Sequence, residues 1–494
     1  MTTSSKSPLA LLLAALASAC ASPGPPRPST APARADGGQA APAQPAEATE
    51  VPAPADGPWR IEERAGFPEW LELGVEQRTR YEYLDEDFRA SNAGEENELF
   101  ALRTLVDVTL HEGPLRATAE LMDSRQYGAP DDAPVNTTIV NPVELLQAHV
   151  GYRAEGVFTA DDALDMQLGR QTLNLGSRRL VARNRFRNTI NSFTGLQAAW
   201  SGAAEETVRA FAFFPVRRLP RDQDELLDNE IEFDEEREET LFYGIHAAKS
   251  FPERDLDAEV YIYGLDEDDE DDVATRDRRI WTAGARLLRA PAEREFGFEW
   301  ESMYQFGDSR ASTSAADQTD LDHSAHFHHL SVGYRFPGES KPTLECLFDY
   351  ASGDDDPDDD ENNRFDTLFG ARRFEFGPTG IFGAFARSNL VSPGLRLKLS
   401  PAASTQVMLA HRLHYLASDT DAWTTSGLVD PSGDAGSFLG QLAEIRVRHD
   451  LVSKNLRLEG GVAHLFAGDF IDDAPNATVQ GDSTYAYLGA TLWL

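Results

Sequence analysis

Arginine is concentrated in one short stretch of this 494-residue chain. Residues 169–188 read GRQTLNLGSRRLVARNRFRN, and their arginines are Arg170, Arg178, Arg179, Arg183, Arg185 and Arg187. A guanidinium group offers a rigid fork of donors that matches a carboxylate, so it is the preferred protein partner of that anion. Because the stretch contains little acid, it predicts a surface that attracts anions. We expect it to begin at the end of a strand and to run into an outer loop.

Other arginines stand at alternating positions within segments that we predict to be strands. They are Arg78, Arg80, Arg103, Arg125, Arg286, Arg396 and Arg412. If these side chains line the lumen of a barrel, they select for anions. Alternatively, they make the wall rigid by pairing with acidic residues of the same face, such as Glu72, Glu76, Glu120 and Glu299. The sequence leaves both roles open.

The segments that hold these arginines alternate with a period of two residues. Between residues 69 and 84, apolar and charged side chains take opposite parities: Leu71, Leu73, Val75, Tyr81 and Tyr83 against Glu72, Glu76, Arg78, Arg80 and Glu82. Successive side chains of a strand point to opposite faces, so one face is apolar and the other is charged. In a membrane barrel the apolar face meets lipid and the charged face lines a wet lumen. In a soluble sandwich the apolar face packs on a second sheet.

About eighteen such segments follow one another, and their connections alternate between long and short. Short connections include 111–114 and 290–294, and long ones include 216–239 and 353–393. Short periplasmic turns and long outer loops are typical of bacterial outer-membrane barrels, whereas a sandwich or jelly roll does not sort its loops by length. Beyond the N-terminus, no uncharged apolar run of about 18 residues is present to form a membrane helix. We therefore predict an all-β fold, a closed transmembrane antiparallel β-barrel.

The N-terminal residues have the pattern of an export signal. Lys6 precedes an apolar run, residues 8–17, which has the length of a signal-peptide core and is too short to span a bilayer as a helix. We predict a signal peptide over residues 1–19, a disordered Pro/Ala-rich periplasmic linker over 20–58, and the outer-membrane barrel over 59–494. Cys20 follows the predicted cleavage site and resembles the lipid-bearing cysteine of a lipobox. Lipidation of Cys20 and a plain secretory signal are the two alternatives.

The chain as a whole is acidic, with 83 Asp and Glu against 45 Lys and Arg and a formal net charge of −38. Such a surface repels phosphate backbones, so nucleic acid is disfavoured as a partner. Much of the acid falls in predicted outer loops, including residues 354–361. These loops are either solvated surface or a source of oxygen ligands for structural Ca²⁺, with Asp354, Asp355 and Asp356 as candidates. We expect no other cofactor or metal.

Several short motifs lie in the predicted strands and loops. They are ELMDSR (120–125), ELLQ (144–147), LGRQTLNLGSRRLV (168–181), RNT (187–189) with SFTG (192–195), DYASGDDD (349–356) with FDTLF (365–369), and GVAHLFAG (461–468). With these motifs the chain resembles the bacterial alginate export family of outer-membrane barrels, over nearly the whole predicted folded part. The stretch over 168–181 is the most specific of them.

The resemblance implies a channel through which a carboxylated polysaccharide leaves the periplasm, drawn by an arginine-rich constriction. The implied positive lining is Arg125, Arg170, Arg183 and Arg187, beside the strand residues Arg78, Arg80 and Arg103. Glu120 and Asp123 lie in the same motif and are implied to orient these arginines. The implied partners are outer-membrane lipid, the anionic polysaccharide and periplasmic proteins of an export complex. The motifs specify the architecture better than the cargo.

Three functions are compatible with these features. The first is passive export of an anionic, alginate-like polysaccharide through an arginine-lined pore in the bacterial outer membrane. The alternative is a general or nutrient-uptake porin for small anionic solutes, with a narrower pore plugged by a folded-in outer loop, for which residues 353–393 are the candidate. The third is an enzyme or adhesin anchored by its barrel. Because the sequence contains no nucleophile elbow, P-loop or HExxH motif, we predict that the protein is not an enzyme.

Overall fold

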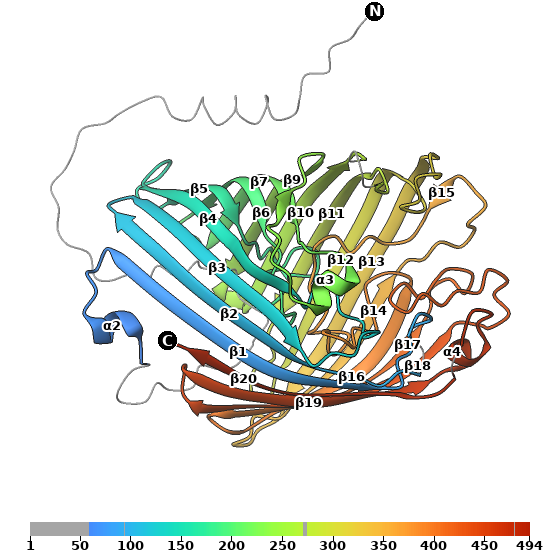
Figure 1. Ribbon diagram of the computed structural model, residues 1–494. Helices are drawn as coiled ribbons and strands as arrows, with labels where there is room; N and C mark the ends of the chain where they lie inside the picture. Colours follow the sequence, from blue (N-terminus) through green and yellow to red (C-terminus); the bar gives the residue numbers. More distant parts are fainter. Residues whose placement is uncertain (1–58, 93, 270–273, 479) are drawn as a thin grey trace, which may run out of the picture. The chain divides into compact units, whose positions relative to one another are not determined.

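The computed structural model describes residues 59–92, 94–269, 274–478 and 480–494. Within these residues, 18 antiparallel strands pair in chain order, and the sheet closes because the last strand pairs with the first (Figure 1). The strands are β1 (Leu71–Asp85), β2 (Asn97–Glu112), β3 (Leu115–Tyr127), β4 (Asn141–Glu155), β5 (Ala163–Gln171), β6 (Phe193–Ser201), β7 (Glu206–Arg217), β9 (Thr240–Phe251), β10 (Leu256–Glu267), β11 (Arg279–Arg289), β12 (Phe296–Ser309), β13 (Leu321–Arg335), β14 (Thr343–Ala351), β16 (Leu390–Ala402), β17 (Thr405–Tyr415), β18 (Phe438–Val452), β19 (Leu456–Ala467) and β20 (Ser483–Trp493). The predicted closed antiparallel barrel is therefore confirmed.

Short elements lie before β1 and in the connections between the strands. β8 (Glu235–Glu236) pairs with β7, and β15 (Glu361–Asn362) runs parallel to β13. The helices are α2 (Ile61–Ala65), α3 (Gln223–Leu227), α4 (Asp469–Asp473) and the 3₁₀ turn η1 (Pro252–Arg254). No helix in the described part of the chain is long and apolar enough to cross a membrane.

The alternation predicted for the strands is present in the fold. In β1, the charged residues Arg78, Arg80 and Glu82 are buried inside the barrel. Large aromatic residues stand exposed near both ends of the strands: Trp70, Tyr152, Phe296 and Phe336 near the short turns, and Phe100, Tyr127, Tyr304 and Phe306 near the long loops. Two aromatic girdles around an apolar outer face are typical of barrels that span a membrane. We call the two ends of the barrel the turn end and the loop end.

Two of the long connections fold into the barrel instead of projecting from it. The first inner segment, residues 172–192, follows β5, and the second, residues 363–389, precedes β16. The two segments pair with each other, since the amide of Phe369 donates to the carbonyl of Leu180 at 2.8 Å. Gly370 permits this approach, because a Cβ at that position would lie 1.7 Å from the carbonyl oxygen of Arg179. Residues 169–188 therefore run from the end of a strand into a connection at the loop end, as predicted, but this connection folds into the lumen and does not project outward.

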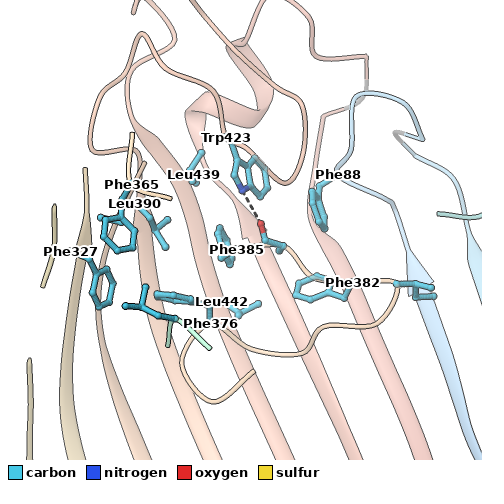
Figure 2. Packing of buried hydrophobic residues seen from close by; sticks show 14 of the residues in the cluster. Phe88, Phe327, Phe365, Phe376, Phe382, Phe385, Leu390, Trp423, Leu439 and Leu442 are labelled. Carbon is cyan, nitrogen blue, oxygen red and sulfur yellow. Dashed lines mark hydrogen bonds between the residues drawn. The ribbon is translucent and has the colours of Figure 1, made fainter. Parts of the chain in front are cut away.

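The second inner segment builds a large aromatic core within the barrel. Figure 2 shows Phe365, Phe376, Phe382 and Phe385 of this segment beside strand and loop residues, which are Phe88, Phe327, Leu390, Trp423, Leu439 and Leu442. The indole Nε1 of Trp423 donates to the carbonyl of Ala384 at 2.8 Å. Burial of this many rings makes the segment a packed element of the fold and not a solvated loop.

The predicted signal peptide, linker and Cys20 lie outside the described residues. The described chain begins at Trp59, whose amide donates to the side-chain oxygen of Asn455 at 2.7 Å. The side-chain nitrogen of Asn455 in turn donates to the carbonyls of Trp59 and Trp493, each at 2.6 Å. The buried side-chain amide of Asn455 therefore connects the start of the described chain to the end of β20.

Candidate functional site

Three of the predicted lumen arginines hold the first inner segment against the wall. Arg78, Arg80 and Arg103 point inward and are 7%, 3% and 2% exposed. Their guanidinium groups donate to the backbone carbonyls of residues 185–187 over 2.6 to 3.2 Å. Arg103 also pairs with Glu76. These arginines face the lumen, but backbone and wall carboxylates occupy them.

Arg183 of the first inner segment is fixed by an acid of the wall. Its guanidinium pairs with both carboxylate oxygens of Glu120 in β3 and donates to the hydroxyl of Thr172 at 2.9 Å. The amide of Gln147 donates to the same carboxylate at 2.5 Å. Glu120 is 3% exposed, so this contact is a buried, charge-assisted anchor of the segment.

Arg125 and Asp123 do not face the lumen. They share the outward parity of β3 with Leu121 and Tyr127, which are 52% and 49% exposed. Arg125 pairs with Asp123 at 2.9 Å on that outer face. The lumen-lining role predicted for Arg125 is therefore wrong, because the inward positions of this strand belong to the opposite parity, which includes Glu120.

Arg170 lies near the loop end of the wall and not in open lumen. It shares the parity of Leu168, which is 58% exposed. Its guanidinium pairs with Glu144 at 2.6 Å and with Glu236 of β8 at 2.7 Å. Arg170 therefore joins β5 to the 218–239 loop.

Arg187 is the predicted lining residue with the least compensation. Among the described residues, no carboxylate forms an ion pair or hydrogen bond with its guanidinium. Burial, together with the neighbouring guanidinium groups of Arg372 and Arg218, lowers the pKa of Arg187 to about 9. The interior therefore holds a group of like charges close to the first inner segment.

A buried ionic network joins both inner segments to the wall. Arg179 of the first segment pairs with Glu299 at 2.6 Å and Glu301 at 2.5 Å, both on β12, and with Glu375 of the second segment. Glu375 also accepts from Arg387. All five side chains are nine-tenths buried or nearly so. Arg179 therefore pairs with acidic residues of the wall, including Glu299, as in the alternative role that the sequence left open for arginine.

A cationic cavity of about 220 Å³ lies at the turn end, and we call it the lower cavity. Ten lysine and arginine side chains contribute to its lining: Arg178, Arg179, Arg289, Arg335, Lys341, Arg373, Arg396, Lys398, Arg446 and Arg448. The acidic residues of the lining are Glu299, Glu345, Glu375 and Glu444. The lumen near the turns therefore carries excess positive charge, although the whole chain has a net charge of −38.

Most of these cavity residues were missed from the sequence. The signal for two of them was the ordinary strand alternation, since Arg446 and Arg448 alternate with Ile445 and Val447, which are 42% and 39% exposed. Arg289, Arg335 and Lys398 also lie in strands, namely β11, β13 and β16. Lys341 lies in a short turn and Arg373 in the second inner segment, where no period of two marks the inward side.

The sequence profile of the alginate export family matches residues 69–483. The chain belongs to the alginate export family. No curated protein matches the chain closely enough in sequence to be counted as a relative.

Solved outer-membrane channels share the fold of this alginate export family barrel. OccAB1 of Acinetobacter baumannii has a TM-score of 0.56 at 13% identity, over 87% of this chain and 97% of that one. The outer membrane protein OpdK of Pseudomonas aeruginosa has 0.54 at 11%, over 86% and 99%. A BenF-like porin of Pseudomonas fluorescens Pf-5 has 0.54 at 12%, over 87% and 100%. At these identities the likeness concerns the fold alone.

Family and fold place the protein in the bacterial outer membrane as a channel-type barrel. In such barrels the short turns face the periplasm and the long loops face outward. The lower cavity of this alginate export family member is therefore on the periplasmic side.

Two acidic sites bear on metal binding. Asp354 is buried beside Asp421, whereas Asp355 and Asp356 are exposed, so calcium at this loop stays a prediction. Within the described residues, one group of at least three potential ligand atoms lies within 4.8 Å, formed by His329, Asp349 and Glu375. Arginines already pair with both of these carboxylates, which makes the group part of the ionic network.

We expect the stability of the fold to depend on pH through Asp234, which lies in the loop between β7 and β9. Burial and the nearby Glu144 raise its pKa from 3.8 to about 7. The folded state therefore holds a proton that the unfolded chain releases at lower pH, so stability falls as pH rises from about 4 through about 7. We expect the thermal unfolding midpoint in detergent to be lower at pH 8 than at pH 5. Asp234→Asn should reduce this difference, and an unchanged difference would contradict the assignment.

Proposed function

We propose that this protein is a passive conduit that exports an anionic, alginate-like polysaccharide across the outer membrane, past an arginine-lined interior. The observation that carries the proposal is the excess of cationic side chains around the lower cavity, on the side where a periplasmic polymer arrives. Guanidinium groups attract and orient carboxylates. Membership of the alginate export family supports a polymer of that charge as the cargo.

The two inner segments lie on the proposed route. Residues 177–179 and 373–375 line the lower cavity, and residues 191–193 and 369 line a second cavity at the loop end. We expect these segments to shift during transport, because a polymer needs a continuous path. An uptake porin for small anions predicts a folded-in loop as well, so the inner segments do not separate the two functions.

Conductance in planar bilayers tests the proposal. We expect an anion-selective current that polyuronate blocks when it is added at the periplasmic side at low salt, where charge is screened least. Arg446→Gln should weaken the block by about fivefold, the factor for one exposed ion pair of about 1 kcal/mol. Arg254→Gln, at an exposed turn residue outside the cavity, is the matched control. Passage of small neutral sugars without block would overturn the proposal in favour of an uptake porin.

A further inference from the structure

A second cavity, of about 450 Å³, lies among the loops at the extracellular end. We call it the upper cavity. Its lining comes from residues 137, 191–193, 215–218, 221, 237, 267, 274–276, 278, 313 and 369. Its volume falls within the range of small-molecule sites, about 300 to 1,000 Å³.

The upper cavity carries an excess of positive charge. Its charged lining residues are Arg217, Arg218, Arg221, Arg237, Arg276, Arg278 and a single acid, Glu267. Glu267 is shared, because it pairs with Arg237 at 3.0 Å and with Arg278 at 2.7 Å. Arg278 also pairs with Asp366 at 2.8 Å, and Arg217 pairs with Glu235 at 4.0 Å. Three of the lining arginines, Arg217, Arg237 and Arg278, therefore have carboxylate partners.

In the part of the chain that the structure describes, two arginines of this cavity form no ion pair. Within the described residues, no carboxylate is bonded to the guanidinium of Arg218 or of Arg276. Arg218 donates to the side-chain oxygen of Asn191, and its Nε is buried without a hydrogen-bond partner. A buried donor without a partner costs about 1–3 kcal/mol, and a bound anion would remove that cost.

An acid outside the lining compensates Arg218 only in part. The carboxylate of Asp234 lies close enough to Arg218 to favour the charged form of its guanidinium, against the effect of burial, which lowers the pKa of Arg218. The pKa of Asp234, raised to about 7 by burial and by Glu144, leaves its carboxyl only partly ionised near neutral pH. Arg187 and Arg372, which lie near each other in the interior, add further positive charge on the side of Arg218.

The uncharged part of the lining suits a sugar ring. Thr137 and Thr313 offer hydroxyl groups, and Phe193 and Phe369 offer aromatic rings that meet edge to face at 5.1 Å between centroids. A uronic acid has one carboxylate, several hydroxyl groups and an apolar ring face. Arginines, hydroxyl groups and aromatic rings together complement these three features.

We propose that the upper cavity is a binding site for a single uronate unit, whose carboxylate binds between Arg218 and Arg276. The inference rests on the proposed function in that the site would receive the emerging end of the polymer. It concerns the loop end alone and does not involve the residues of the lower cavity.

Calorimetric titration of the full-length protein in detergent tests this site. The probes are digalacturonate, the neutral disaccharide cellobiose and inorganic phosphate. We expect digalacturonate to bind and cellobiose not to bind. Arg218→Gln and Arg276→Gln should each weaken digalacturonate binding by at least about tenfold, because a hydrogen bond to a charged group contributes about 1.5–3 kcal/mol. Arg279→Gln is the control, since its side chain is 50% exposed and lies outside the cavity.

The outcomes separate this site from the proposed function. Equal binding by the wild type and both cavity variants overturns the site, provided that each variant keeps the heat-shifted migration of a folded barrel on gels. Binding of phosphate without digalacturonate also overturns it, because the cavity then takes simple anions only. The bilayer experiment is independent of these results. If polyuronate does not block the wild-type channel, the export function is defeated, whereas the calorimetric result for the upper cavity stands.

Discussion

Glu375→Gln should release the second inner segment from the lumen. Glu375 is 4% exposed and accepts from two buried arginines, Arg179 and Arg387. Removing its charge leaves both guanidinium groups in a low-dielectric interior with only a neutral partner. Breaking a buried ion pair from one side costs about 3–5 kcal/mol. This cost exceeds the effect expected of any exposed substitution in the chain.

Trypsin digestion and single-channel conductance measure the release of the second inner segment. Trypsin cleaves after arginine, and Arg372, Arg373 and Arg387 lie within the segment. We expect cleavage there to be slow in the wild type, because Arg373 and Arg387 are 7% and 1% exposed, and fast in Glu375→Gln. The single-channel conductance should rise at the same time, since the segment no longer fills the lumen.

A matched control distinguishes release from general loss of charge. Glu361→Gln makes the same change in the connection that leads into this segment, at an exposed side chain. It should leave both cleavage and conductance unchanged. If Glu375→Gln keeps the trypsin resistance and conductance of the wild type, then the ionic network does not hold the segment.

The barrel could be predicted from local pattern because the strand period is local. Leu71 and Val75 against Glu76 and Arg78 reveal both the strand and its inward face, and the fold follows that parity. The pattern is weaker at the start of β13 (Leu321–Arg335). Its first outward residues, such as Asp322 and Ser324, are polar as well and hide the alternation.

The same reasoning failed where apolar residues face inward. Leu121 and Met122 are both apolar, so hydrophobicity alone does not show which of them faces the lumen. Met122 is 1% exposed because Ile190 of the first inner segment packs against it. Arg125 was therefore assigned to the wrong face. A contact between residues so far apart in the chain leaves no periodic trace in either segment.

The amino-acid composition of the second inner segment indicates that it is buried, but its sequence has no periodic pattern that shows where it packs. Residues 363–389 contain six phenylalanines, an unusual density for a solvated loop. That density favours burial but does not say where the segment packs. The contacts that determine its position join residues far apart in the sequence. An example is the hydrogen bond from the amide of Ile381 to the carboxylate of Glu82, at 3.0 Å.

Asn188→Leu should detach the first inner segment. The side chain of Asn188 is fully buried. Its nitrogen donates to the carbonyls of Leu102, Arg125 and Ile139 at 3.0, 3.3 and 2.8 Å, and its oxygen accepts from Arg78 at 3.1 Å. Leucine has a similar volume but neither donates nor accepts. Each buried group left unpaired costs about 1–3 kcal/mol.

The loss should appear as a lower urea midpoint in detergent and as trypsin cleavage after Arg183, Arg185 or Arg187. Gln318→Leu removes an amide from an exposed loop position and should change neither readout. A double-mutant cycle with Arg78→Met isolates the contact between Arg78 and Asn188. A coupling energy near zero, with an unchanged midpoint in Asn188→Leu, would show that the segment is held by its apolar contacts alone. A clear coupling energy would show that polar contacts hold the segment, including the hydrogen bonds from the wall arginines to the backbone carbonyls of residues 185–187.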